Sequence, residues 1–201
     1  MKNLFLTLII IISSNSIAQE NYKLEIDGKT NEIELDKNYE IKIDNKTHNI
    51  KIASKDTLVY KGGKISFKYF KDHKISTTQL DDGIEQLMIM TADGSGIIIQ
   101  LYSNMNPQLL NEMLLNEVTK ESVGYGYELK RKDYERTLSS KQKINVDKAV
   151  LTYKDEINIY EVATFGTKDE GVLIMTMKMD NEKNSAGQKL IDLTWNSFKY
   201  N

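Results

Sequence analysis

Alternate methionines give the chain its most distinctive candidate for metal chemistry. Met175, Met177 and Met179 fall at every second position, so an extended strand would place three thioethers on one face, and Met88 and Met90 repeat the spacing earlier. Soft sulfur ligands of this kind suit Cu(I) in an exported protein. Methionine also fills irregular space in hydrophobic cores. Because no histidine lies next to the cluster, we interpret this face as core rather than as a metal site.

Histidine could supply a general base, and the chain has two, His48 and His73. Both stand among polar residues of predicted turns. A hydrolase could assemble a serine triad across the fold. However, the chain has no Gly-x-Ser-x-Gly motif, and Gly94-Ser95-Gly96 is better explained as a hairpin loop. We therefore predict that both imidazoles lie on the surface.

Paired carboxylates beside glycines suggest calcium loops at Asp81-Asp82 and at Asp169-Glu170. Calcium loops space their ligands at the first, third and fifth positions, and neither pair does so. Both pairs are better explained as turns. The sequence therefore predicts no catalytic residue, no cofactor-binding residue, no metal ligand and no cofactor.

The overall charge is close to balanced, with a formal net charge of −2 over 201 residues. The one basic cluster, 130–132, is followed at once by Asp133 and Glu135, which indicates a solvated strand or loop face. Nucleic-acid binding needs clustered positive charge, so it is excluded as an expectation. Eleven tyrosines fall mostly on predicted strands, where we expect them to pack.

The first residues predict export. Lys2 is a short positive region, Leu4–Ile12 is apolar, and Ser16-Ile17-Ala18 provides small residues for cleavage before Gln19. The apolar run is shorter than the roughly 20 residues that span a bilayer. No cysteine occurs, which excludes a lipoprotein anchor, disulfides and thiolate metal sites. We predict a signal peptide over 1–18 and a periplasmic or secreted protein with no transmembrane segment after cleavage.

The stretch 84–102 predicts the centre of a sheet, and two other segments provide helices. Leu87–Met90 and Ile97–Ile99 are apolar without alternation, so both sides of these strands must be covered. The polar residues 93–96 between them indicate an antiparallel hairpin. Asn106-Pro107 begins an amphipathic helix over about 108–120. Asp180 and Asn181 can cap a closing helix whose buried stripe is Leu190, Ile191, Trp195 and Phe198. These elements predict an α+β fold, an antiparallel sheet with helices on both faces (an α/β/α sandwich), over 58–201.

Residues 22–52 contain an internal repeat, because 22–35 aligns on 39–52 without gaps. Polar and apolar residues alternate, and the turn pairs Asp27-Gly28 and Asp44-Asn45 fall at matching places. We predict two successive hairpins, an N-terminal four-stranded β-meander, within an extension over 19–57. So short a segment should dock on the main domain or on a partner.

From about 58 to 201 the chain resembles the PsbP/DcrB-like family of α/β/α sandwiches. The resemblance rests on the opening strand 64–69, the central hairpin, the Asn106-Pro107 helix and the closing helix with its ending Trp195-Asn196-Ser197-Phe198. It departs at Phe70, where members often have a proline. The family consists mostly of non-catalytic photosystem subunits, envelope lipoproteins and chaperones for secreted effectors. The resemblance therefore implies binding rather than turnover, and it transfers no site residue.

Two hypotheses follow. The first is an exported, non-catalytic binding or adaptor protein of the bacterial cell envelope, whose meander or open sheet edge engages another envelope protein. The alternative is a periplasmic protein that binds a small molecule or metal in a cleft between a helix and the sheet. An enzyme would require His48 or His73, and we predict that the protein is not one.

Overall fold

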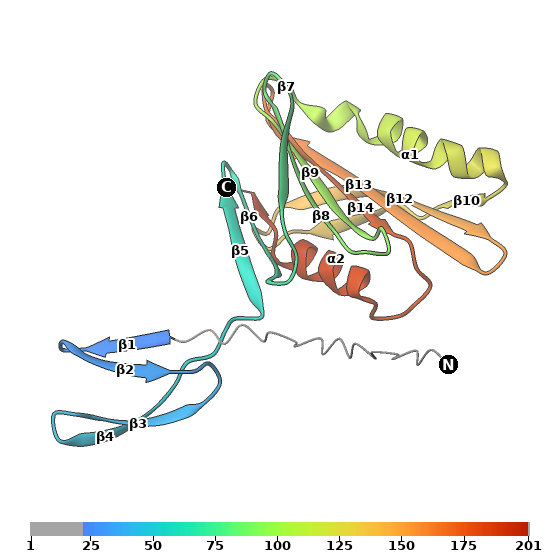
Figure 1. Cartoon of the computed structure of the whole chain (residues 1–201). Coiled ribbons are helices and arrows are strands. Elements are labelled where there is room, and N and C mark those ends of the chain that lie inside the picture. Colours follow the sequence, from blue (N-terminus) through green and yellow to red (C-terminus); the bar gives the residue numbers. More distant parts are fainter. Residues whose placement is uncertain (1–21, 201) are drawn as a thin grey trace, which may run out of the picture. The chain divides into compact units, whose positions relative to one another are not determined.

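The computed structural model describes residues 22–200, and the chain divides into two compact units after Ser54 (Figure 1). The predicted signal peptide, 1–18, lies outside the described residues. Within residues 22–200 no helix is both long enough and apolar enough to cross a membrane. Each unit is described by itself.

The first unit consists of two antiparallel hairpins. Its strands are β1 (Tyr22–Ile26), β2 (Lys29–Ile33), β3 (Asn38–Ile43) and β4 (Lys46–Lys51). Asp27 and Gly28 have φ of 48° and 76°, and Asp44 and Asn45 have φ of 49° and 61°, as two-residue hairpin turns of this type require. The register repeats with the sequence, because Tyr22 lies opposite Ile33 and the equivalent Tyr39 lies opposite Ile50. The two predicted hairpins and their turns are confirmed.

The predicted four-stranded meander is wrong, because β2 and β3 are not paired and the hairpins form two separate two-stranded sheets. The connection between them bends at Asp36, whose φ is 62°. Its N–H then donates to the carbonyl oxygen of Ile52 at 2.8 Å, and the N–H of Glu34 donates to the Tyr39 hydroxyl at 2.7 Å. These bonds tie the connection to the second hairpin and prevent β2 from running on into a ladder with β3.

The second unit is built from eleven strands, two α-helices and one short 3₁₀ helix. In chain order these are β5 (Thr57–Gly62), β6 (Ile65–Phe70), β7 (Ser76–Asp81), β8 (Ile84–Met90), β9 (Gly96–Tyr102), η1 (Pro107–Leu109), α1 (Asn111–Tyr125), β10 (Glu128–Arg131), β11 (Tyr134–Thr137), β12 (Lys143–Tyr153), β13 (Glu156–Gly166), β14 (Gly171–Lys178), α2 (Ala186–Ser197) and β15 (Lys199–Tyr200).

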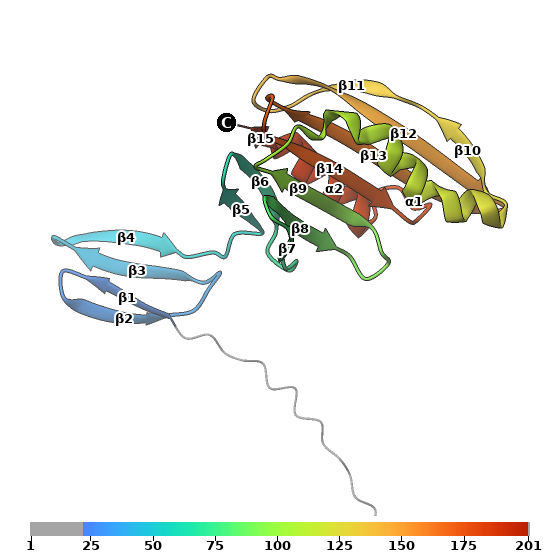
Figure 2. The ribbon, with the colours of Figure 1, turned by 90° about the horizontal axis from the view of Figure 1, so that it is seen from above.

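Eight of these strands form one antiparallel sheet in the order β10-β12-β13-β14-β9-β8-β7, with β11 also paired to β12 (Figure 2). The predicted central hairpin is confirmed as β8 and β9. Strands β10 and β11 divide one edge of the sheet between them, and the break falls at residues 132–133. At the break the carboxylate of Asp133 accepts the backbone N–H of Lys148 at 2.8 Å, which replaces a lost ladder bond.

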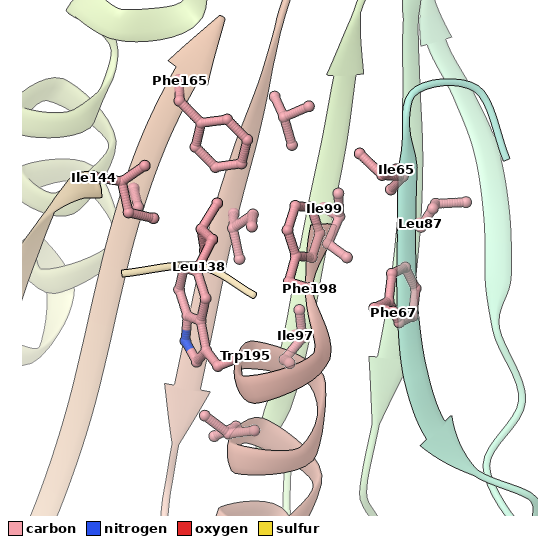
Figure 3. Close-up of a cluster of buried hydrophobic side chains, with 14 of the residues drawn as sticks. Ile65, Phe67, Leu87, Ile97, Ile99, Leu138, Ile144, Phe165, Trp195 and Phe198 are labelled. Carbon is pink, nitrogen blue, oxygen red and sulfur yellow. The ribbon is translucent and has the colours of Figure 1, made fainter. Parts of the chain in front are cut away.

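The larger hydrophobic cluster lies where the sheet meets α2 and a second, three-stranded sheet, β15-β6-β5 (Figure 3). Trp195 and Phe198 enter it from α2 and the residue that follows, and Phe67 enters it from β6. The ring of Phe67 stacks on Phe198 at 6.2 Å and on Tyr60 at 5.0 Å between centroids. The hairpin β5–β6 is therefore part of the core.

A second, separate cluster forms between α1 and the middle strands of the large sheet. Leu115 is the most buried residue of the helix, and it packs with Leu151, Val162 and Leu173. The helix ends at Gly126, which has a φ of 110° that suits glycine. This cluster fixes α1 over β12 and β13.

The expected α+β fold, an α/β/α sandwich with helices on both faces, is wrong. The described residues are 53% strand and 17% helix, and the large sheet alone has eight strands. The sequence prediction has the apolar faces of the sheet packed against helices alone. In the structure much of the cover of the larger cluster comes from strand β6, where Ile65 and Phe67 are each 1% exposed. The second unit is therefore a mostly β domain.

Candidate functional site

A pocket of about 500 Å³ opens between α2 and the end of the large sheet formed by β11 to β14. We call it the cationic pocket. It is lined by Lys132, Tyr134, Arg136, Lys148, Ile159, Glu161, Thr176, Lys178, Gln188, Ile191 and Asp192. Its volume falls within the range of small-molecule sites.

The floor of the cationic pocket is a row of three opposed residues on neighbouring strands. Glu161 of β13 lies opposite both Lys148 of β12 and Thr176 of β14. The ammonium of Lys148 donates to Glu161 Oε1 at 2.8 Å, and the Thr176 hydroxyl lies 3.5 Å from Glu161 Oε2. Glu161 is 7% exposed, so its charge is held by this ion pair rather than by water.

The side wall comes from β11, where Tyr134 and Arg136 alternate on one face. The guanidinium of Arg136 lies 4.9 Å from the ring centroid of Trp195, an arrangement in which the aromatic face attracts the cation. Its Nε is buried without a hydrogen-bond partner. Stacking on Trp195, itself 2% exposed, therefore positions Arg136 while leaving part of its donor capacity unused.

The charge of the lining is unbalanced. Lys178 pairs with Asp180 at 3.1 Å, and Lys148 pairs with Glu161, but among residues 22–200 neither Lys132 nor Arg136 forms an ion pair. Four cationic side chains line the pocket against two carboxylates. An excess of positive charge in a partly enclosed site attracts anions.

The pKa of the Tyr134 hydroxyl is affected by burial and by neighbouring charges of both signs. Burial raises the pKa of its hydroxyl above the usual value, and the negative charge of Glu161 adds to this, while Arg136 opposes it. The Tyr134 phenol therefore stays protonated over the physiological range and can donate or accept a hydrogen bond. The arrangement can hold an anion and a hydroxyl group together.

The methionines that we weighed as a copper site lie elsewhere. Met175, Met177 and Met179 are partly buried and pack against the cluster beneath α1. The hydroxyl of Tyr160 lies 3.8 Å from the sulfur of Met179. Met88 lies in line with Met175 across β9, because both are opposite Ile98. This is the packing role that the sequence favoured.

The structure does not bring the histidines into a catalytic arrangement. His48 is exposed on β4 in the first unit. His73 belongs to the second unit, where its ring lies 6.1 Å from that of Phe70 and its Nδ1 has no hydrogen-bond partner. Neither histidine lines the cationic pocket.

The carboxylates weighed as calcium ligands take part in local contacts. The side chain of Asp81 accepts the N–H of Asp82 at 2.8 Å, which is a turn interaction. Glu170 forms an ion pair with Lys64. Within residues 22–200 no group of three or more histidine or acidic side chains is arranged to hold a metal.

Sequence reasoning missed the pocket, although one signal was available. Lys132, Tyr134 and Arg136 occupy alternate positions and so share a face of an extended chain. The sequence predicts a solvated face for the basic cluster 130–132. Instead Arg131 is 30% exposed and forms ion pairs with Glu112, Asp133 and Asp147, while Lys132 turns into the pocket.

The fold and pocket define a mostly β domain with a cation-lined site beside a helix. No protein-family model matches the chain, and no curated protein is similar to it. One similar solved structure is a crystal structure of a protein from Bacteroides thetaiotaomicron VPI-5482. It is 9% identical, with a TM-score of 0.39, and the match covers 73% of this chain and 48% of that one. The aligned part thus spans about half of that protein, and a likeness at this level supports no argument about function.

Proposed function

We propose that the protein is an exported, non-catalytic binding protein whose ligand is a small organic anion held in the cationic pocket. The observation that carries the proposal is the pair of cations, Arg136 and Lys132, that face the pocket without a carboxylate partner in the described part of the chain. The chain as a whole has a net charge of −2, so this local excess of positive charge is not a general property of its surface.

The unbalanced charge of the pocket favours an anionic ligand. Neighbouring cations repel each other, and burial of a guanidinium nitrogen without a partner costs free energy. A bound anion would relieve the repulsion, since it would neutralise the excess charge and would accept from the guanidinium of Arg136. Arginine suits this role because its planar fork can donate two parallel hydrogen bonds to a carboxylate.

Titration of the mature full-length chain with organic anions, followed by isothermal calorimetry, tests this proposal. Arg136→Gln should weaken binding at least about tenfold, the size expected for losing a charge-assisted hydrogen bond. Lys132→Gln, at an exposed position, provides a second variant that should not disturb folding. Lys120→Gln on α1 removes the same charge from a side chain that is 77% exposed, and it should leave binding unchanged.

Two results would count against the proposal. The first is that no small anion binds at millimolar concentration. The second is that Lys120→Gln weakens binding as much as Lys132→Gln, because the effect would then come from net charge and not from the pocket.

Export remains a prediction from the first residues, and we propose that it places the protein in the periplasm or outside the cell. Mass spectrometry of the protein recovered from the envelope fraction should find Gln19 at the N-terminus. An intact N-terminus, or recovery from the cytoplasm alone, would contradict export.

A second candidate function is adaptor binding to another envelope protein, and exposed apolar side chains favour it. Leu109 is 92% exposed and Met113 is 57% exposed, and every residue of the edge strand β7 is exposed. Apolar side chains and free strand edges of this kind are used in protein recognition. A photo-crosslinker at position 109 should capture one specific envelope protein, and capture of none would argue against this role.

A further inference from the structure

We infer that the ligand of the cationic pocket is a hydroxylated organic acid, the chemistry of a sugar acid, and this rests on the proposed function above. Its carboxylate would accept from Arg136 and Lys132 at the side wall. One of its hydroxyl groups would donate to Glu161 on the floor. The two halves of the pocket thus demand two kinds of group on one ligand.

Glu161 requires a hydrogen-bond donor on the ligand. An ionised carboxylate can only accept hydrogen bonds. Its Oε1 accepts from Lys148 at 2.8 Å, whereas its Oε2 has Thr176 at 3.5 Å, the limit of a useful hydrogen bond, and the Tyr134 hydroxyl also interacts with this carboxylate. Oε2 therefore retains capacity to accept. Inorganic phosphate and sulfate esters present mainly acceptor oxygens, so a ligand that carried nothing else would meet repulsion at this end of the pocket.

A hydroxyl group fits this position better than an ammonium. The ammonium of Lys148 already lies beside Glu161 at 2.8 Å. A further ammonium at Glu161 would be repelled by that of Lys148 at short range, whereas a neutral hydroxyl would not. This favours a hydroxy acid over an amino acid.

The remaining lining suits the carbon skeleton of such a ligand. Ile159 and Ile191 provide apolar surface, and the centroid of the half-buried Tyr134 ring lies 6.0 Å from the Arg136 guanidinium carbon and 5.7 Å from the Lys148 ammonium. Small-molecule sites combine apolar walls with a few polar groups that set orientation. Tyr134, which stays protonated, can hydrogen-bond to either end of the ligand.

A panel of four probes tests this inference on the mature full-length chain by calorimetry: galacturonate, galactose, cyclohexanecarboxylate and inorganic phosphate. Galacturonate has both groups, galactose lacks the carboxylate, cyclohexanecarboxylate lacks the hydroxyl groups, and phosphate has neither a carboxylate nor an alcohol hydroxyl. We expect galacturonate to bind at least about tenfold more tightly than each of the other three, since each lacks one charge-assisted contact.

Glu161→Gln separates the two halves of the site. It should weaken galacturonate about tenfold, because a neutral amide accepts more weakly than a carboxylate, and it should leave cyclohexanecarboxylate unchanged or bound more tightly. Equal weakening of both probes would overturn the inference. Because this variant also removes the counter-ion of Lys148, its thermal unfolding is measured alongside, and the wild-type panel stands by itself if the variant is unstable.

The outcomes distinguish the two proposals. If cyclohexanecarboxylate or phosphate binds as tightly as galacturonate, and Arg136→Gln abolishes that binding, the hydroxy-acid inference fails while the anion-binding function stands. If no probe binds, both fail. A free sugar acid and the end of an acidic polysaccharide share this chemistry, and comparison of galacturonate with polygalacturonate identifies the source.

Discussion

Replacement of Phe67 by alanine tests the observation that a hairpin, and not only a helix, covers the main core. Phe67 is 1% exposed and touches three other aromatic rings, those of Tyr60, Tyr69 and Phe198. Truncation of a fully buried phenylalanine costs 3–5 kcal/mol in general, and the close ring contacts on several sides leave little room for collapse. We expect Phe67→Ala to lower the free energy of unfolding by about 4 kcal/mol. At roughly 2–4 °C per kcal/mol for a domain of this size, Tm should fall by roughly 8–16 °C.

The assay is urea unfolding followed by tryptophan fluorescence. Trp195 is the only tryptophan of the chain and lies in the same cluster, so the signal reports on this core and not on the first unit. Val59→Ala is the matched control, because Val59 lies on the partner strand β5 but is 53% exposed, and it should change stability by less than about 0.5 kcal/mol. A loss below about 1.5 kcal/mol for Phe67→Ala, or one equal to that of the control, would show that the hairpin does not belong to the core.

Two further predictions concern acid stability and close packing. Burial raises the pKa of Asp180, but hydrogen bonds from Ser185 and from a neighbouring lysine outweigh it and hold the pKa below its usual range. The ionised Asp180 therefore stabilises the fold at pH above the unfolded-state pKa of about 3.9, and this stabilisation is lost as pH falls through the lower folded-state pKa. Plots of Tm against pH for wild type and Asp180→Asn should converge on acidification. Plots that stay parallel would contradict this. A β-carbon at Gly96 would lie 2.2 Å from a backbone carbonyl oxygen, whereas one at Gly124 meets nothing within 4 Å. In urea unfolding, Gly96→Ala should lower the free energy of unfolding by about 1–3 kcal/mol, because the new methyl group has no space. Gly124→Ala, in a helix, should raise it by up to about 1 kcal/mol. Similar changes for the two variants would refute the difference in packing.

Local patterns in the sequence were sufficient for several elements. The repeat and its turn pairs predicted both hairpins of the first unit, because the left-handed φ values of Asp27-Gly28 and Asp44-Asn45 depend on residue type. Asn106-Pro107 predicted a helical start, and Asn106 does cap η1, with its side chain accepting the N–H of Gln108 at 3.0 Å. The α-helix itself begins later, at Asn111, and runs to Tyr125 rather than to 120. The closing helix begins at Ala186 and is capped by Ser185, not by the predicted Asp180 or Asn181.

The cationic pocket could not be derived in the same way, because its residues come from four strands, a helix and the connection between β10 and β11. Lys148, Glu161 and Thr176 are far apart in the chain, and only the register of β12, β13 and β14 places them in one row. Alternation showed that each residue lies on one face of its strand, but a strand can present that face to core, solvent or pocket. The boundary between core and pocket is set by where α2 lies along the sheet.

By itself the sequence determined the local conformation of this protein, the alternation of its strands, its two-hairpin repeat and the need to bury both sides of Leu87–Met90 and Ile97–Ile99. These properties depend on residues that are neighbours in the chain. Only the tertiary structure decided what covers those strands and which charged side chains meet. Burial of an apolar face is equally favourable against a helix or against another strand, since the hydrophobic effect is non-directional, and the choice between them rests on how all the elements pack together.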